Sequence, residues 1–245
     1  MGRGPSIEGR KSVEDSKRAK LFTKLIREIT VAARGGADPA GNARLRLAMD
    51  KALAGNMPKD TIERAIRRGS GADGGDSTQE IRYEGYGPGG VAVMVDCMTD
   101  NPTRTVADVR HAFSKNGGNL GTGGSVAFQF HKIGRLVLDT RGDSALDDRI
   151  LEIALDAGAD DVQSDDGRCT VTTSPENFET VRKALSSAGL AVLEADVTMH
   201  ASNRIAIAGE PAETLVKLLH RLEELDDVQD IHHNADLPEV ALSGH

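Results

Sequence analysis

Residues 133–199 decide the fold, and they read IGRLVLDTRGDSALDDRILEIALDAGADDVQSDDGRCTVTTSPENFETVRKALSSAGLAVLEADVTM. Apolar residues recur there first at every second position and then at three- and four-residue steps. These periods predict strand, helix, strand, strand, helix and strand, at 133–140, 145–157, 160–164, 168–173, 175–188 and 190–199. That order is the split βαβ arrangement of ferredoxin-like domains.

The segments on either side contain the elements of a second copy. The periods predict strand, helix and strand twice, at 90–98, 103–116, 125–131 and again at 203–208, 210–224, 227–233. If the central unit is an insertion, the flanking elements complete a second ferredoxin-like domain. We therefore predict an α+β protein in which residues 133–200 are inserted in an α/β domain formed by 79–132 plus 201–240. A serial arrangement with an odd number of strands is the alternative.

The N-terminal segment is predicted to be helical and basic. Apolar residues at three- and four-residue steps predict a helix from Ser12 to about Arg34. Asp38-Pro39 is a candidate start for a second helix that ends near Gly55, and Asn56-Met57-Pro58 opens a third that ends at Gly69. Residues 70–78 are rich in Gly, Asp and Ser, which is typical of a linker. Residues 1–78 are thus expected to form a three-helix domain.

Charge is distributed unevenly between this segment and the rest of the chain. The formal net charge is −8 and the pI is near 5.4. Residues 1–70 nevertheless hold 16 Lys and Arg against 8 Asp and Glu, whereas the remainder holds 14 against 30. Such asymmetry indicates a local nucleic-acid-binding segment. Lys17, Lys20, Lys24 and Arg27, here called the basic row, fall within an arc of about 80° that points away from the apolar stripe. A solvated helix face is the alternative interpretation.

Three further segments are candidates for nucleic-acid contact. Residues 83–90 form an aromatic, glycine-rich entry into the first predicted strand, where two tyrosines could stack on bases or simply shape a turn. Residues 99–105 open a helix whose N-terminus could attract a phosphate, although capping by Asn101 or Thr103 explains the segment equally well. Residues 117–125 are predicted to be a mobile loop that orders on binding. The complete set of predicted nucleic-acid-binding residues is Arg10, Lys11, Lys17, Arg18, Lys20, Lys24, Arg27, Lys59, Arg64, Arg67, Arg68, Tyr83, Tyr86 and Arg104.

Other function classes find little support in the sequence. No apolar run approaches the roughly 20 residues of a membrane span, so a cytoplasmic protein is expected. Cys97 and Cys169 lie in apolar stretches typical of buried free thiols. His232 and His233 are adjacent on a strand and point to opposite faces, which disfavours a shared metal ion. The acidic residues at 160–166 and 223–227 are interpreted as solubilising charge. We expect no enzymatic activity, cofactor, metal or small-molecule substrate.

Four strings together resemble the YebC/PmpR family: LFTKLIREITVAAR (21–34), ALAGNMPKDTIERAIRRG (52–69), EIRYEGYGPGGVAVMVDCMTDNPTRTVADVRHAFSKNGGNLGTGGSVAFQF (80–130) and DDVQDIHHNAD (226–236). The resemblance is collinear over nearly the whole chain. It implies a cytosolic protein with an N-terminal helical domain and two α/β domains, one of which interrupts the other. The chain departs from many relatives at its beginning, where Gly2-Arg3-Gly4 replaces a Gly-His-Ser-Lys-Trp type of start.

The resemblance implies a nucleic-acid partner of one of two kinds. Members of the family are labelled probable transcriptional regulators with DNA-binding activity. A mitochondrial relative activates translation, and bacterial relatives are linked to ribosomes stalled on proline-rich chains. The sequence thus favours a DNA-binding transcriptional regulator or a ribosome-associated translation factor that grips ribosomal RNA. A ligand-sensing ferredoxin-like module without nucleic acid is a third hypothesis.

Overall fold

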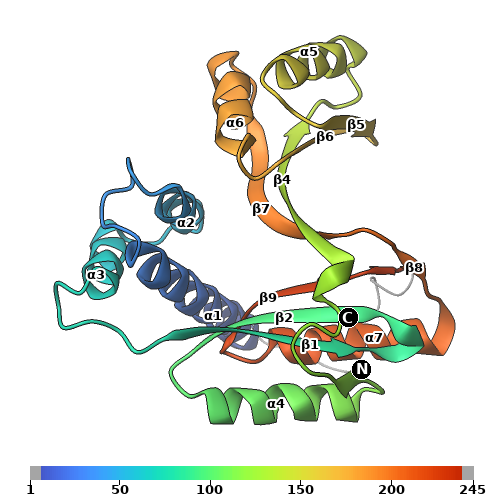
Figure 1. Cartoon of the computed structure of the whole chain (residues 1–245). Helices are drawn as coiled ribbons and strands as arrows, with labels where there is room; N and C mark the ends of the chain where they lie inside the picture. Colours follow the sequence, from blue (N-terminus) through green and yellow to red (C-terminus); the bar gives the residue numbers. More distant parts are fainter. Residues whose placement is uncertain (1–6, 239–245) are drawn as a thin grey trace. The chain divides into compact units, whose positions relative to one another are not determined.

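Three helices form the N-terminal part of the structure. The computed structural model describes residues 7–238, with side chains from residue 14 onward. Helices α1 (Ile7–Ala33), α2 (Ala43–Ala54) and α3 (Lys59–Gly69) follow one another along the chain (Figure 1). Apolar side chains at helical spacing pack between them, and the buried set is Ile29, Ala32, Ala33, Leu45, Ala48, Ala52, Met57, Ile62 and Ala65. The predicted three-helix region is therefore confirmed.

The start of α2 differs from the prediction. The side-chain oxygen of Asn42 accepts a hydrogen bond from the backbone N–H of Leu45 at 3.0 Å, as an N-cap residue does. The amide nitrogen of Asn42 also donates to two backbone carbonyls, one at the end of α1 and one in the turn after it. The Asp38 carboxylate instead accepts from a backbone N–H two residues further on, within that turn. The predicted helix start at Asp38-Pro39 is therefore wrong.

The first four-stranded sheet is assembled from segments far apart in the sequence. It contains β1 (Gln79–Tyr86), β2 (Ala92–Thr99), β3 (Asn119–Leu120) and β9 (Val228–His233) in the antiparallel order β3-β1-β2-β9. Helices α4 (Pro102–Lys115) and α7 (Gly209–Glu223) cover one face of this sheet (Figure 1). The core between helices and sheet includes Val93, Val95, Phe113, Leu215 and Leu218. A short turn, η1 (Pro88–Gly90), joins β1 to β2.

The second four-stranded sheet lies in a separate compact unit. That unit is Ala127–Ile205, and Met1–Val126 with Ala206–His245 make up the other. Its elements in chain order are η2 (Ala127–Gln129), β4 (Phe130–Asp139), α5 (Ser144–Asp156), β5 (Asp161–Asp165), β6 (Arg168–Thr173), α6 (Phe178–Ser187) and β7 (Val192–Ala201). The strands pair antiparallel in the order β5-β6-β4-β7. The predicted fold class is confirmed as α+β, with a three-helix region and two antiparallel α/β units of which one interrupts the other in sequence, whereas the exact domain boundaries stay predictions.

One strand of the first sheet escaped prediction. Residues 79–86 form β1, so the segment interpreted as an entry turn is a strand as far as Tyr86. Ile81 and Tyr83 alternate there with Glu80, Arg82 and Glu84, which is the period of a strand, but the glycine-rich end of the segment led to its interpretation as a turn.

Two other predicted strands also differ from the structure. The strand predicted at 125–131 is wrong: residues 127–129 form the short helix η2, and strand structure begins at Phe130, where β4 already starts. The strand predicted at 203–208 is only β8 (Ile205–Ala206), which pairs with β10 (Ala235–Asp236) outside both four-stranded sheets. In the first sheet β1 lies beside β2, and the short strand just before α7 pairs with β10 instead.

Candidate nucleic-acid interface

The exposed side of α3 carries a group of cations, here called the α3 basic face: Lys59, Arg64, Arg67 and Arg68. Ile62 and Ala65 are buried on the opposite side of the helix, which fixes the orientation of this face. The four cations occupy an arc of roughly 180° at 100° per residue. All four side chains are exposed to solvent.

The ion pairs on the α3 basic face are local and solvent-exposed. Arg64 pairs with Asp60 at 3.4 Å, and Arg67 pairs with Asp73 at 2.9 Å. Exposed pairs of this kind are worth roughly 0–1 kcal/mol, so these arginines can exchange their partners for phosphates. Within the described residues, neither Lys59 nor Arg68 has an ion pair.

The connection between α2 and α3 is short and sharply turned. It consists of Gly55–Pro58, in which Asn56 has a positive φ of 59°. Met57 is buried, and its N–H donates to the carbonyl of Ala52 at 2.9 Å. Two helices joined by a turn of three or four residues that contains glycine are the elements of a helix-turn-helix, in which the second helix contacts nucleic acid. The sequence predicted both helices and the turn between them, but it shows no strong helix-turn-helix signature.

Three of the four cations of the basic row, Lys20, Lys24 and Arg27, donate hydrogen bonds to other parts of the chain. Lys20 Nζ donates to the carbonyl oxygen of Glu224 at 3.2 Å, and Lys24 Nζ donates to that of Glu223 at 3.3 Å. These carbonyls lie at the C-terminal end of α7, where the last residues have no intrahelical partners and the helix dipole favours cations. Burial lowers the pKa of Lys24, against the opposing effect of nearby carboxylates such as Glu223. Lys20 is nevertheless exposed and Lys24 is half-buried, so their contact with nucleic acid stays a prediction.

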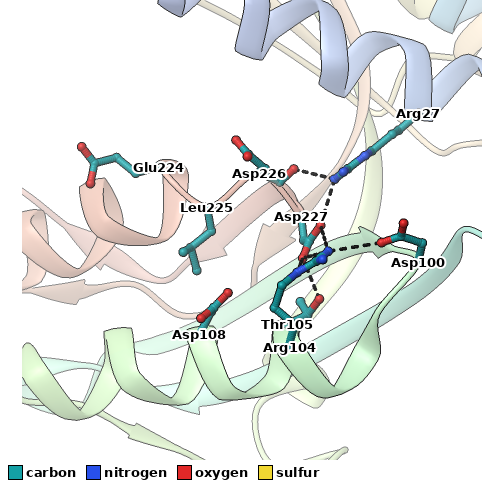
Figure 2. A pocket seen from close by; sticks show the side chains of 9 residues that line it. All are labelled: Arg27, Asp100, Arg104, Thr105, Asp108, Glu224, Leu225, Asp226 and Asp227. Atoms are coloured by element: carbon teal, nitrogen blue, oxygen red, sulfur yellow. Dashed lines mark hydrogen bonds and ion pairs between the residues drawn. The ribbon is translucent and has the colours of Figure 1, made fainter.

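Arg27 donates hydrogen bonds both to the turn that follows α7 and to β2. Its Nη1 atom donates to the carbonyl oxygens of Asp226 at 2.7 Å and Met98 at 3.1 Å, and to Oδ1 of Asp227 at 3.2 Å. Figure 2 shows the guanidinium pointing from α1 toward the turn that follows α7. The arginine thus connects the helical region to the first α/β sheet.

Asp227 is the centre of a buried polar cluster. Its carboxylate accepts hydrogen bonds from Oγ1 of Thr105 at 2.8 Å and from Nη2 of Arg104 at 3.0 Å, in addition to Arg27 (Figure 2). Only 5% of the residue is exposed. Burial disfavours the ionised carboxylate, but the hydrogen bonds and the two arginines outweigh that effect and lower the pKa of Asp227. The cluster lines a pocket of about 480 Å³ beside the N-terminus of α4.

The predicted phosphate site at the start of α4 already holds an anion. Asn101 caps the helix by accepting from the N–H of Arg104 at 3.1 Å, as the capping alternative predicted. The anion near that helix start is the chain's own Asp227, and Arg104 also pairs with Asp100 at 3.2 Å. The role of Asp227 was not predicted from the sequence, because an aspartate in an acidic turn is interpreted as solubilising charge. Its position directly before a strand is the one available signal.

The two candidate tyrosines point to opposite faces of β1. Tyr83 packs against the core under α4 and α7, and burial raises the pKa of its hydroxyl. Tyr86 is exposed, and its hydroxyl donates to the carbonyl of Ser125 at 3.1 Å. Stacking of bases on both rings at once is therefore incompatible with this strand.

The glycine-rich loop at 117–125 is attached to β1. Glu84 is buried, and its carboxylate accepts hydrogen bonds from the N–H groups of Gly124 at 2.6 Å and Val126 at 3.0 Å. Two residues of the loop also form β3, which pairs with the end of β1. The loop thus has defined contacts in this structure, where the sequence predicted mobility.

The remaining predicted contact residues lie on α1. Lys17 is exposed on the turn before Lys20, and the guanidinium carbon of Arg18 lies 5.2 Å from the centre of the Phe22 ring. Arg10 and Lys11 belong to α1, but their side chains fall outside the described residues.

Polar residues elsewhere suggest no second site of chemistry. His232 Nε2 lies 3.1 Å from Oδ2 of Asp96, whose other oxygen accepts from Arg82 at 2.6 Å. Burial opposes ionisation of Asp96, but the hydrogen bonds from His232 and Arg82 lower its pKa to about 2.

Cys97 and Cys169 are buried and free, as predicted. In the described part of the chain, no group of three or more histidine, cysteine or carboxylate side chains could hold a metal ion. None of the described helices has the length and hydropathy needed to cross a bilayer.

Comparison with known proteins gives a consistent result over nearly the whole chain. Residues 4–72 match the model of the TACO1/YebC protein N-terminal domain, and residues 78–235 match that of the TACO1/YebC second and third domain. A probable transcriptional regulatory protein of Methylococcus capsulatus is 60% identical over 240 residues, which cover 97% of this chain and 96% of that protein. One from Xanthomonas campestris is 56% identical over 239 residues, 96% of this chain and 98% of that one. The crystal structure of a conserved hypothetical protein from Aquifex aeolicus has a TM-score of 0.81 and 44% identity, and covers 91% of this chain and 92% of that chain.

Proposed function

Because the chain belongs to the TACO1/YebC family, and relatives 56–60% identical to it are named probable transcriptional regulatory proteins, we propose that it regulates transcription by binding DNA. The α3 basic face is the surface that contacts phosphates in this proposal. The observation that carries it is the exposure of all four cations on the second helix of a short helix–turn–helix pair.

Phosphate contacts account for affinity in this arrangement. Lysines and arginines that neutralise phosphates release condensed counterions, which favours binding without regard to sequence. Sequence discrimination requires contacts with base edges or with DNA shape. Residues near the start of α3, where Lys59, Asp60 and Glu63 are exposed, occupy the position from which a recognition helix reaches bases.

The proposal is tested by a charge-removing variant of α3 and a matched variant of α4. Lys59→Ala/Arg68→Ala removes two cations that have no described ion pair, and Arg110→Ala/Lys115→Ala removes two exposed cations from α4. Binding to a 30-bp duplex of mixed sequence is measured by fluorescence anisotropy at several salt concentrations. Each lost phosphate contact reduces the slope of log K against log salt by about 0.9, so the α3 variant should lose about 1.8. The α4 variant should keep the wild-type slope.

Two outcomes would contradict the proposal. Equal slopes for the α3 variant and the wild type would show that the α3 basic face does not contact phosphates. Tighter binding to a folded ribosomal RNA fragment than to any duplex, with salt-sensitive sedimentation of the protein with ribosomes, would replace transcription by the translation-factor hypothesis.

A further inference from the structure

The helical region is attached to the first α/β sheet by polar contacts. The buried apolar core of the three helices and the core beneath α4 and α7 are separate clusters that share no residue. Hydrogen bonds and ion pairs join the two parts at three places: Lys20, Lys24 and Arg27 with residues 223–227, Arg34 with Asp76, and Arg44 with Glu80. Such contacts weaken as salt rises, in contrast to a shared apolar core.

The linker between the two parts can change direction. Gly71, Gly74 and Gly75 all have positive φ angles, of 87°, 96° and 88°. Arg34 donates to the carboxylate of Asp76 at 3.0 Å and to the Thr78 carbonyl, so the end of α1 stays next to the linker. Movement about this point would carry the basic row away from α7 without disturbing either apolar core.

The groups that bind the basic row resemble those that a nucleic acid would offer. Lys20, Lys24 and Arg27 occur at positions i, i+4 and i+7, so they span about 10 Å of helix. Their acceptors are carbonyl oxygens at the negative end of α7 and the carboxylate of Asp227. Phosphate oxygens bind the same cations through charge-assisted hydrogen bonds.

We infer that the α1–α7 contact, defined as Lys20, Lys24 and Arg27 bound to residues 223–227, is an autoinhibitory contact that a polyanionic nucleic acid displaces. The inference rests on the proposed function, since it assumes that DNA binds the helical region. In the closed form DNA meets the α3 basic face and Lys17. In the open form the remainder of the basic row is added to the interface.

The inference predicts that removing acidic charge near α7 strengthens DNA binding. Glu223 and Asp226 are exposed acids that lie next to the basic row and favour its charged form. Glu223→Gln/Asp226→Asn should raise the population of the open form and thus the apparent affinity, because affinity scales with the competent fraction. Because both proteins bind the duplex in the open form, their salt slopes should be alike, and we expect the affinity of the variant to be about tenfold higher at low salt.

The matched control is Glu210→Gln/Glu213→Gln, which removes the same charge from the other end of α7, where both acids are exposed. A general loss of repulsion would strengthen the DNA binding of both double variants alike. That result would overturn the inference.

Opening can be measured without DNA. Nitroxide labels on cysteines introduced at Ala54 and Ala107, both exposed, report the distance between α2 and α4, while the native Cys97 and Cys169 are buried. We expect a narrow distribution for the wild type at low salt, a broad one for Glu223→Gln/Asp226→Asn, and a shift of the wild-type distribution when the 30-bp duplex saturates it. An unchanged distribution in all three conditions would overturn the inference. Opening by salt and by the acid variant in a protein that binds no duplex would support the contact as a closure and contradict the proposed function.

Discussion

Replacing Gly69 by alanine should loosen α3 from α1. A Cβ at Gly69 would overlap the carbonyl oxygen of Thr30, and it would lie 2.8 Å from the carbonyl carbon of Thr30 and 2.9 Å from the Cβ of Ala33. These atoms belong to the α1 backbone or are fixed to it, so no side-chain rotation relieves the overlap. Overpacking of this kind costs about 1–3 kcal/mol, and the better helix propensity of alanine offsets up to about 1 kcal/mol. We therefore expect a net loss of about 1–2 kcal/mol in the helical region.

Hydrogen–deuterium exchange of peptides from α1, α2 and α3 measures this loss directly. A change of 1–2 kcal/mol corresponds to exchange that is roughly 5 to 30 times faster. Gly41→Ala is the control, since nothing lies within 4 Å of a Cβ there. If Gly69→Ala exchanged as slowly as Gly41→Ala, the close approach of α3 to α1 would be refuted as a constraint on residue 69.

Three further substitutions test individual contacts. Asp96→Asn should reduce the loss of unfolding free energy at acid pH. The folded-state pKa of Asp96, about 2, lies below the ordinary value, so this group costs the wild type about 2 kcal/mol of stability as the pH falls from about 4 toward 2. Denaturant titrations at each pH should show no such contribution in the variant. Glu84→Gln should leave one backbone N–H of the 121–126 segment poorly paired, which costs about 1–3 kcal/mol and would appear as faster hydrogen exchange of that segment alone. Asn42→Ala should cost about 1 kcal/mol by removing the cap of α2, and unchanged exchange in the first turn of α2 would contradict that assignment.

The sequence predicted the inserted unit well because its signals are local. Helices α5 and α6 and strand β6 each bury one face, so apolar periodicity of two or 3.6 residues identifies them. Gly142, Gly158, Gly167 and Gly189 stand at the turns between them with positive φ, as punctuation by glycine predicts.

The first sheet was harder to predict for two reasons. β1 pairs with the next strand, β2, across the short turn η1, but glycines at its end led to its interpretation as a turn. The partners of Glu84 are backbone groups of the 121–126 segment, about 40 residues away. A charged residue whose partner is distant in sequence looks the same, in a single sequence, as one that faces water, so the loop bound to Glu84 was predicted to be mobile.

The basic row shows the same limit for function. Counting charges over residues 1–70 treats Lys20, Lys24 and Arg27 as available, yet their acceptors come from residues 223–227, about 200 positions away. The excess of cations in the helical region therefore overstates what the closed form offers to a polyanion. On the α3 basic face, Arg64 and Arg67 pair with Asp60 and Asp73, which are close in sequence and exposed, so their charge remains available. If DNA binds this chain, the first phosphates should meet α3, and the salt dependence of that first step should reflect α3 alone until the α1–α7 contact opens.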